Sequence, residues 1–542
     1  MPPSYELPLI PMSVSSAFFL RLRPGTGAET SGICLRSKLT RGGLGLLIAS
    51  LGLFLGACNG QAEIRNVILV TLDTTRPDYL GAWGRPGNPT PNLDALAEDG
   101  IRFSTAISSS AVTPVSHASI LTGRHQYQHG LRILAGAGGF QLPTNVPTLA
   151  SAMKSRGFAT AAFHSAFPVS AIYGFERDFD VFEDVGGTGI QTDEEGNARW
   201  DVAEGQRRSD MTTNMVIDFV DKTPGPFFIW IHYWDPHDGL LFPPAEFVNG
   251  RVPVDANGAP QWSSKAYALE VSYVDQQFGR LIEHLKQRGQ YDQTMFAVVS
   301  DHGEGLEDGA AKHGWAAHRI LYQEQIHVPL IFRIPNVKGG KVVDAMVRSV
   351  DIYPTLLDYA DIAPGGELGG SSLRPLIEGQ AETGRIAYAD QINQWDANAR
   401  MLINRPQADF LHVVMDDEWK LIYRPRDPKT SELYAYRRDI HEQQNLFSKR
   451  KDISIKLMAD LAEREPWVLA PPTAGGAGMD AGSLETLQKL GYTGGGVSLS
   501  GEEIAGMWHW LCPVAWHFLP EAGTCPEHQA RLLPARKMKE KQ

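Results

Sequence analysis

Thr113 and Pro114 open a predicted helix in the stretch VTPVSHASILTGRHQYQHG, residues 112–130. A threonine hydroxyl can cap a helix by accepting from an N–H group two or three residues on. Proline suits the first turn because its missing N–H would be unpaired there. A hydroxyl at a helix N-terminus also lies in positive potential, which favours an anion. The pair therefore marks either a simple cap or an anion-handling hydroxyl, and the neighbouring motifs must decide.

Three apolar runs end in residues that can bind metals or move protons. Each run is continuous and rich in β-branched or aromatic residues, as expected of strands buried on both faces. The predicted strands are residues 66–72, 226–234 and 295–300. They are followed by Asp73, by Asp235-Pro236-His237, and by Asp301-His302. Ligands of open α/β sheets bind beyond the carboxyl ends of strands, so these side chains are predicted to converge.

The stretch from Thr113 to Arg124 resembles the signature of the sulfatase family, in the alkaline phosphatase superfamily. That signature has Cys or Ser, then x-Pro-x-Arg, leading into Leu-Thr-Gly-Arg, which is present here at residues 121–124. The resemblance places Thr113 at the nucleophile position and His117 where the family has Arg. Sulfatases convert the Cys or Ser to formylglycine, which Thr cannot form, so no formylglycine is expected. Phosphodiesterases and phosphoethanolamine transferases of the superfamily use an unmodified Thr.

The resemblance also assigns roles to the polar residues. The implied metal ligands are Asp73, Thr113, Asp301 and His302. The implied catalytic groups are Thr113, His237, His117 and Arg124, and the implied substrate contacts are His318 and His313. Many sulfatases have a second Asp after the first, where this chain has Thr74. The implied cofactor is a divalent cation, calcium by resemblance, and these ligand types also suit magnesium, manganese or zinc.

Two further histidines are given structural roles. His232 lies inside the predicted strand 226–234 and is expected in the core. His164 follows a short predicted strand at residues 158–163, and the Lys-x-His motif that sulfatases often carry there is missing. We therefore expect a core role for His232 and a structural role for His164, with a site role for His164 as the weaker alternative.

The expected fold is α/β, an alkaline-phosphatase-like sandwich with a large central mixed, mostly parallel sheet and a smaller C-terminal α+β subdomain. The resemblance spans residues 64–495, with a catalytic domain at 64–390 and the subdomain at 391–495. Residues 496–542 form an extra tail of unknown role.

The amino terminus is predicted to be an export signal. Lys38 and Arg41 precede an apolar run at residues 44–55, which is short for a transmembrane helix and is followed by Leu-Gly-Ala-Cys ending at Cys58. This ending resembles a lipobox and makes residues 1–57 a signal peptide, although its long front leaves a later start open. The alternative is a plain signal peptide or a buried helix. The prediction is an exported bacterial lipoprotein, anchored through Cys58 and facing the periplasm or the exterior.

The net charge of the chain and its cysteine content limit which binding partners and metal sites are expected. The formal net charge of -12 argues against a nucleic-acid partner but allows an anionic substrate at a metal. The four cysteines show no CxxC or zinc-ribbon spacing, so no structural zinc site is expected. After export, Cys512 and Cys525 in the tail could form a disulfide.

Three functions remain open. The first is a sulfatase-like ester hydrolase with Thr113 as metal-activated nucleophile, acting on a small anionic ester. The second is a phosphodiesterase, phosphonate monoester hydrolase or phosphotransferase, because a sulfate ester on Thr113 would have to be displaced rather than eliminated. The third is a non-catalytic, ligand-binding lipoprotein. Retention of Asp73, His237, Asp301 and His302 together argues against the third.

Overall fold

The computed structural model describes residues 64–136, 139–185, 205–237, 241–254, 261–306, 319–382, 384–394, 396, 402, 408–464, 479–489 and 508–536. The predicted signal peptide, Cys58, His313 and His318 lie outside these residues.

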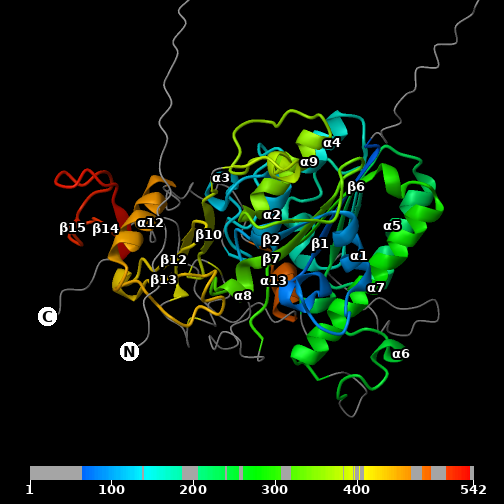
Figure 1. Ribbon diagram of the computed structural model, residues 1–542, viewed down its shortest axis with the longest axis horizontal. Helices are drawn as coiled ribbons and strands as arrows, with labels where there is room; N and C mark the ends of the chain where they lie inside the picture. The colour runs from blue at the N-terminus through cyan, green and yellow to red at the C-terminus, as the bar shows by residue number, and fades with distance from the viewer. Residues whose placement is uncertain are drawn as a thin grey trace, which may run out of the picture. The chain divides into compact units, whose positions relative to one another are not determined.

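A nine-stranded mixed sheet forms the centre of the fold, in the order β4-β3-β5-β1-β6-β7-β2-β8, with β9 paired to β2 (Figure 1). Neighbouring strands from β4 to β6 are parallel, whereas β7 is antiparallel to both β6 and β2. The strands are β1 (Asn66–Leu72), β2 (Ile101–Ile107), β3 (Ala159–His164), β4 (Val181–Glu183), β5 (Phe227–Tyr233), β6 (Thr294–Ser300), β7 (His327–Arg333), β8 (Lys341–Val343) and β9 (Val347–Arg348). The predicted mixed, mostly parallel α/β sheet is confirmed.

Helices cover both faces of this sheet, because successive strand residues point to opposite sides. In β1, Val67 and Leu69 join the core that contains helices α2, α4 and α9, whereas Ile68 and Val70 join the core under α1, α5 and α7. The α-helices of this part are α1 (Pro91–Asp99), α2 (Thr113–Thr122), α3 (Gln126–His129), α4 (Leu149–Ser155), α5 (Ser209–Lys222), α6 (Ala245–Val248), α7 (Ser264–Gln287), α8 (Gln323–Ile326), α9 (Ile352–Tyr359) and α10 (Arg374–Ile377). Burial on both faces explains the continuous apolar runs of the strands.

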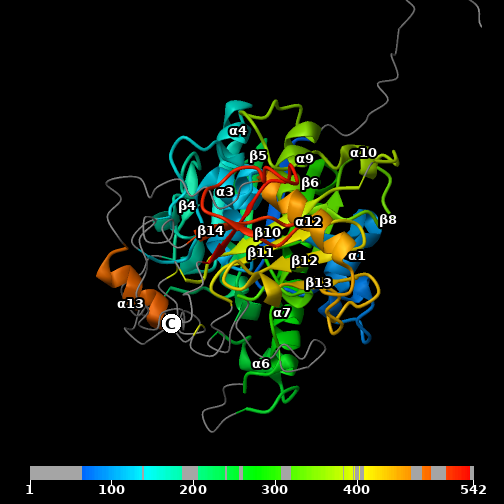
Figure 2. The ribbon, with the colours of Figure 1, turned by 90° about the vertical axis from the view of Figure 1, so that its left-hand side faces the viewer.

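A second, antiparallel sheet follows in the order β10-β11-β12-β13. Its elements are β10 (Ala387–Gln391), β11 (Leu411–Met415), β12 (Lys420–Tyr423), β13 (Glu432–Tyr434) and the covering helix α12 (Lys451–Arg464). Figure 2 shows α12 lying across this sheet. Leu457 and Leu461 of α12 pack on Val414 and Leu421, which closes a separate small core. The predicted C-terminal subdomain thus has sheets and a closing helix, and the predicted boundary at residue 390 lies at the end of β10.

The tail contains a third sheet, of strands β14 (Trp508–Leu511), β15 (Phe518–Leu519) and β16 (Leu533–Arg536), in the order β15-β14-β16. A further helix, α13 (Ala481–Lys489), precedes it. Cys512 and Cys525 are both free thiols, so the disulfide that the sequence allows between them is not formed. Among the described residues, no helix combines the length and apolar character needed to cross a membrane.

Candidate active site

The carboxyl ends of β1 and β6 bring Asp73, Asp301 and His302 together. The strands are parallel and in register, with Leu72 opposite Ser300, so the next residues, Asp73 and Asp301, fall at the same edge of the sheet. One ligand atom from each of the three side chains lies within 4.8 Å of the others, and all three side chains are buried. Asp73 and Asp301, which lie 228 positions apart in the sequence, are therefore close enough to bind the same ion.

Asp301 is held by hydrogen bonds on both sides. Its Oδ1 accepts from the backbone N–H groups of Thr74 (3.1 Å) and His302 (2.7 Å). Its backbone carbonyl accepts from the hydroxyls of Ser108 (2.5 Å) and Ser116 (2.6 Å). Its Oδ2 has no hydrogen-bond partner although it is buried. Burial, and then the charge of Asp73, raise the pKa of Asp301 well above its usual value, so a cation beside Oδ2 would relieve an unfavourable arrangement.

Thr74, which replaces a second Asp of many sulfatases, does not face this group with its side chain. Its φ of 47° turns the chain sharply after β1, and its hydroxyl donates to the carbonyl of Pro236 at 2.8 Å. Its N–H meanwhile holds Asp301. Thr74 therefore positions Asp301 and connects the residues that follow β1 with those that follow β5.

Thr113 begins α2 and faces His302. Its Oγ1 lies 3.2 Å from Nε2 of His302. The Nδ1 of His302 lies 3.0 Å from the carbonyl oxygen of Gly303, which can only accept, so Nδ1 carries the ring proton and Nε2 offers its lone pair. Thr113 is not the helix cap considered from sequence, because the capping position belongs to Val112 and no side chain caps the helix. The hydroxyl is thus free of a capping role and points into the carboxylate–histidine group.

Thr71, one strand position inside β1, links two histidines beneath this group. Its Oγ1 lies 3.0 Å from Nε2 of His117 and 3.1 Å from Nδ1 of His232, and it accepts from the indole N–H of Trp230 at 3.0 Å. The other nitrogen of His232 lies 3.4 Å from Asp73 Oδ2 and has no hydrogen-bond partner. His232 therefore belongs to the site, which differs from the core role expected of it.

His117 has both ring nitrogens engaged. Its Nδ1 donates to the carbonyl of Thr113 at 2.8 Å, one turn earlier in α2, and its Nε2 meets Thr71. Burial, opposed by the Thr113 hydrogen bond, lowers the pKa of His117 to about 3. With both nitrogens engaged, His117 anchors the first turn of α2 over β1.

His237 lies in the short 3-10 helix η5 (Asp235–His237) after β5, and its ring stacks on Trp234 at a centroid distance of 3.7 Å. His237 is 6% exposed. Glu304, which follows the Asp301-His302 pair, lies close enough to His237 to interact with it. Burial raises the pKa of Glu304 to about 7, opposed first by His237. No role is predicted for Glu304 from sequence, although it is part of the Asp-His-Gly-Glu motif.

Arg124 is not brought to this group. Arg124 lies past the opposite end of α2, where its guanidinium donates to the carbonyls of Thr122 (3.2 Å) and Gly365 (3.0 Å). It secures the end of a ten-residue helix, which spans roughly 15 Å, so it does not face the substrate position proposed from sequence. His164 lies opposite His232 in the register of β3 and β5, and its Nε2 lies 3.3 Å from Asp184.

The donor set fits a divalent cation. Two carboxylates and one imidazole converge in a buried site, and the unpartnered Oδ2 of Asp301 faces His302 Nε2 at 3.4 Å. Oxygen and nitrogen donors of this kind suit calcium, magnesium, manganese or zinc. Asp73, Asp301 and His302 are the residues that would hold the ion, and Thr113 borders them.

The strand-end site on a helix-covered mixed sheet defines the class of α/β proteins whose ligands bind at the carboxyl ends of strands. Comparison with known proteins specifies the family. Residues 65–362, more than half of the chain, match the family model described as Sulfatase. Residues 311–465 match the model described as N-sulphoglucosamine sulphohydrolase, C-terminal. The chain therefore belongs to the sulfatase family, an enzyme family whose members hydrolyse ester bonds.

Individual relatives are distant. An N-acetylglucosamine-6-O-sulfatase of Bacteroides thetaiotaomicron is 24% identical, with 74% of this chain and 87% of that protein covered. An arylsulfatase of Clostridium perfringens is 26% identical, with 67% and 89% covered. Among solved structures, a complex with the substrate D-glucosamine-2-N,6-O-disulfate aligns at a TM-score of 0.60 and 22% identity, covering 74% of this chain and 98% of that one. The phosphonate monoester hydrolase of Agrobacterium radiobacter aligns at 0.56 and 20%, covering 74% and 95%.

Proposed function

We propose that this chain is a metal-dependent, sulfatase-like hydrolase that cleaves an anionic ester with Thr113 as nucleophile. The observation that carries the proposal is the position of Thr113 Oγ1, 3.2 Å from His302 Nε2 at the edge of the Asp73–Asp301–His302 group. A divalent cation bound there would lower the pKa of an adjacent hydroxyl and polarise the ester oxygens. The sulfatase family membership supports the reaction class.

The chain's own residues prepare Thr113 for attack. Because Nε2 of His302 carries the lone pair, it is the nitrogen that would bind the cation, and Thr113 Oγ1 lies beside it at 3.2 Å. The backbone of Thr113 is fixed by His117, which donates to its carbonyl. The N-terminus of α2, which no side chain caps, presents positive potential to the oxygens of a sulfuryl or phosphoryl group. The hydroxyl, the residues that would hold the cation and the anion-binding helix end are thus preorganised before substrate arrives.

His237 is proposed as the acid that protonates the leaving oxygen. It lies on the neighbouring strand end, and the stacked Trp234 fixes the plane of its ring. A histidine held this way can donate a proton to the leaving oxygen of a bound ester.

Two substrate classes are supported by different observations. Similarity to sulfatases that act on sulfated sugars favours a sulfate ester. The chemistry of threonine favours a phosphate or phosphonate ester, because a hydroxyl nucleophile forms a covalent ester that water must displace, whereas the formylglycine hydrate releases sulfate by elimination. Structural similarity to phosphonate monoester hydrolases supports this second class.

A panel of matched aryl esters distinguishes these candidates. Purified protein would be assayed against a sulfate ester, a phosphate monoester, a phosphodiester and a phosphonate monoester, each with calcium, manganese or zinc. Turnover of one class that is lost in Thr113→Ala and retained in Thr113→Ser supports the proposal and names the ester. Turnover that persists in Thr113→Ala contradicts it. Metal binding without turnover of any ester would favour the non-catalytic binding protein.

We also propose that the protein is exported and anchored through a lipid on Cys58. The support is the basic flank and apolar run before Leu-Gly-Ala-Cys. Cys58→Ser should shift the protein from the membrane fraction to the soluble exported fraction of expressing bacteria, whereas Cys34→Ser should not. An unchanged membrane fraction in Cys58→Ser would contradict the anchor.

A further inference from the structure

The tail beyond residue 508 contains two turns built on the same pattern. Each begins with a Cys-Pro step, at Cys512-Pro513 and again at Cys525-Pro526. In each turn the cysteine N–H donates to the carbonyl five residues on: Cys512 to His517 (2.9 Å) and Cys525 to Ala530 (2.8 Å).

The second half of the pattern repeats as well. The cysteine carbonyl accepts from the N–H four residues on, at Trp516 and Gln529, both at 2.9 Å. These two residues share a left-handed backbone, with φ of 59° and 51°. Backbone N–H groups two and three residues after each cysteine also point at its sulfur. In each turn, several backbone N–H groups therefore converge on one sulfur atom.

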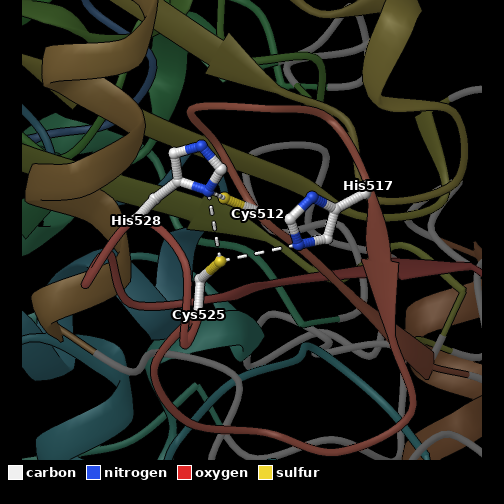
Figure 3. A group of neighbouring side chains, drawn as sticks. All are labelled: Cys512, His517, Cys525 and His528. Atoms are coloured by element: carbon white, nitrogen blue, oxygen red, sulfur yellow. Dashed lines mark hydrogen bonds between the residues drawn. The ribbon is translucent and has the colours of Figure 1, made fainter.

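The two turns face each other and each adds a histidine, His517 from the first and His528 from the second (Figure 3). The ligand atoms of Cys512, His517, Cys525 and His528 all lie within 4.8 Å of one another. Cys525 Sγ lies 3.5 Å from His517 Nε2 and 3.5 Å from His528 Nδ1, and Cys512 Sγ lies 3.8 Å from His528 Nδ1. A tetrahedral zinc ion with Zn–S of about 2.3 Å and Zn–N of about 2.05 Å would set these sulfur–nitrogen separations at roughly 3.6 Å.

We propose that Cys512, His517, Cys525 and His528 form a tetrahedral, structural zinc site in the tail. Two thiolates and two neutral imidazoles are the donor set of closed zinc sites, and all four positions are filled by protein. Binding releases the two thiol protons and needs no oxidant. This differs from the expectation from sequence, since the CxxC spacing is absent but each Cys-Pro turn supplies one cysteine and one histidine. The site is separate from the proposed active site and does not depend on it.

The small size of the tail explains why it would need a metal. Its own core consists of Cys512, Cys525 and Leu532, with Trp510 and Leu519 packed on it. Strands of two to four residues around so small a core are not stable unless a metal ion or a disulfide cross-links them. A zinc ion at the centre of this cluster would fix both turns at once.

The zinc site in turn would secure a contact with the second sheet. Trp516, in the first turn, packs against Phe447 at a centroid distance of 5.8 Å. The hydroxyl of Tyr423 on β12 donates to the carbonyl of Pro534 on β16 at 2.8 Å, and Leu533 joins the core beneath α12. The inferred role of the metal is therefore to stabilise the packing of the tail on β12 and α12.

Metal analysis of the full chain, purified without chelator, tests the site. We expect the Cys512→Ser/Cys525→Ser variant to hold one zinc per chain less than wild type. His509→Ala is the matched control, since His509 lies on β14 of the same sheet but outside the cluster, and it should keep the wild-type zinc content. Cobalt-exchanged wild type should show thiolate-to-cobalt charge-transfer absorption. The Asp73–Asp301–His302 group has no sulfur and cannot give that signal.

The wild-type spectrum and thiol state decide the question even if the double variant does not fold. A Cys512–Cys525 disulfide in the native protein, found by peptide mapping without reductant, would overturn the proposal. So would unchanged zinc content in the double variant, or cobalt-loaded wild type without charge-transfer absorption. Thiols that react with a labelling reagent only after chelation would support it.

Discussion

Thr113 Oγ1 and His302 Nε2 lie 3.2 Å apart although 189 residues separate them in the chain. Thr113 is the first residue of α2, and His302 is the second residue after β6. The contact exists because Ser116 of α2 donates to the Asp301 carbonyl, which locks the helix N-terminus onto the strand end. The proposed nucleophile is therefore positioned by backbone contacts rather than by the substrate.

Asp301→Asn should remove the stabilisation that a bound cation gives. In wild type, a metal at 100 times its Kd would raise the free energy of unfolding by about 2.7 kcal/mol. The variant should lose most of this gain, and without metal it should be at least as stable as wild type, because the buried Asp73 and Asp301 no longer repel each other. Thermal unfolding with and without manganese measures both effects. An equal metal-dependent rise in the variant would show that Asp301 is not a ligand.

His232→Phe should weaken metal binding without unfolding the protein. Phe keeps the ring volume in the core but loses the contacts to Thr71 and to Asp73 Oδ2. Loss of a group that orients a ligand typically costs about 10- to 100-fold in metal affinity. Calorimetric titration with manganese measures this, with His284→Ala on the surface of α7 as control. If His232→Phe bound manganese with wild-type affinity, His232 would have a purely structural role.

Gly303→Ala should disturb the Asp301-His302 pair through a backbone clash. A Cβ at position 303 would lie 2.1 Å from the carbonyl oxygen of Glu324, so the loop must move. We expect a loss of roughly 1–3 kcal/mol in stability and reduced metal affinity. Gly482→Ala in α13 is the control, because its Cβ has no such clash and alanine favours helix. Denaturant unfolding that shows equal stability for both variants would contradict the close approach.

Asp235 should make folding stability fall as the pH rises toward neutrality. Burial raises the pKa of Asp235 to about 7, although Ser209 donates to it through its N–H and hydroxyl. The unfolded chain has a pKa near 3.9, so between the two values only the folded state holds the proton. Stability from this group is complete below pH ~4 and is lost as the pH rises through ~7, by roughly 2 kcal/mol from pH 5 to 7.

Comparison with Asp235→Asn isolates this contribution. Urea unfolding of both proteins at pH 5 and 7.5 should show the wild type losing stability relative to the variant, which cannot ionise at this position. Parallel pH dependence of the two proteins would mean that Asp235 is not titrating in this range.

The fold and the Asp73–Asp301–His302 group could be predicted, because both depend on sequence patterns that are strong within short segments. Buried parallel strands read as continuous apolar runs, and strand ends in such sheets gather functional residues, which is enough to bring Asp73, Asp301 and His302 together. His232 was not predicted as a site residue, because a single polar residue within an apolar strand is usually part of the core. Its nearness to the carboxyl end of β5, where Thr71 lies in register with it, is the signal that could have identified it.

Other features depend on tertiary geometry that sequence spacing does not encode. Arg124 follows a family motif, yet the length of α2 carries it away from Thr113. Whether His117 is charged depends on burial, which the motif does not show. The tail site uses two Cys-Pro turns that meet only when β14 and β16 pair.

The measurement that tests the central claim most directly is mass spectrometry of the active-site peptide after acid quenching during turnover. We expect a sulfuryl or phosphoryl group on Thr113 in the wild type, and none in Thr113→Ala, which should lose at least about 10³-fold in kcat/KM. Thr113→Ser should carry the group at residue 113 as well. Turnover with an unmodified Thr113 under quench conditions that preserve a reference phosphothreonine or sulfothreonine peptide, together with full activity in Thr113→Ala, would contradict the account.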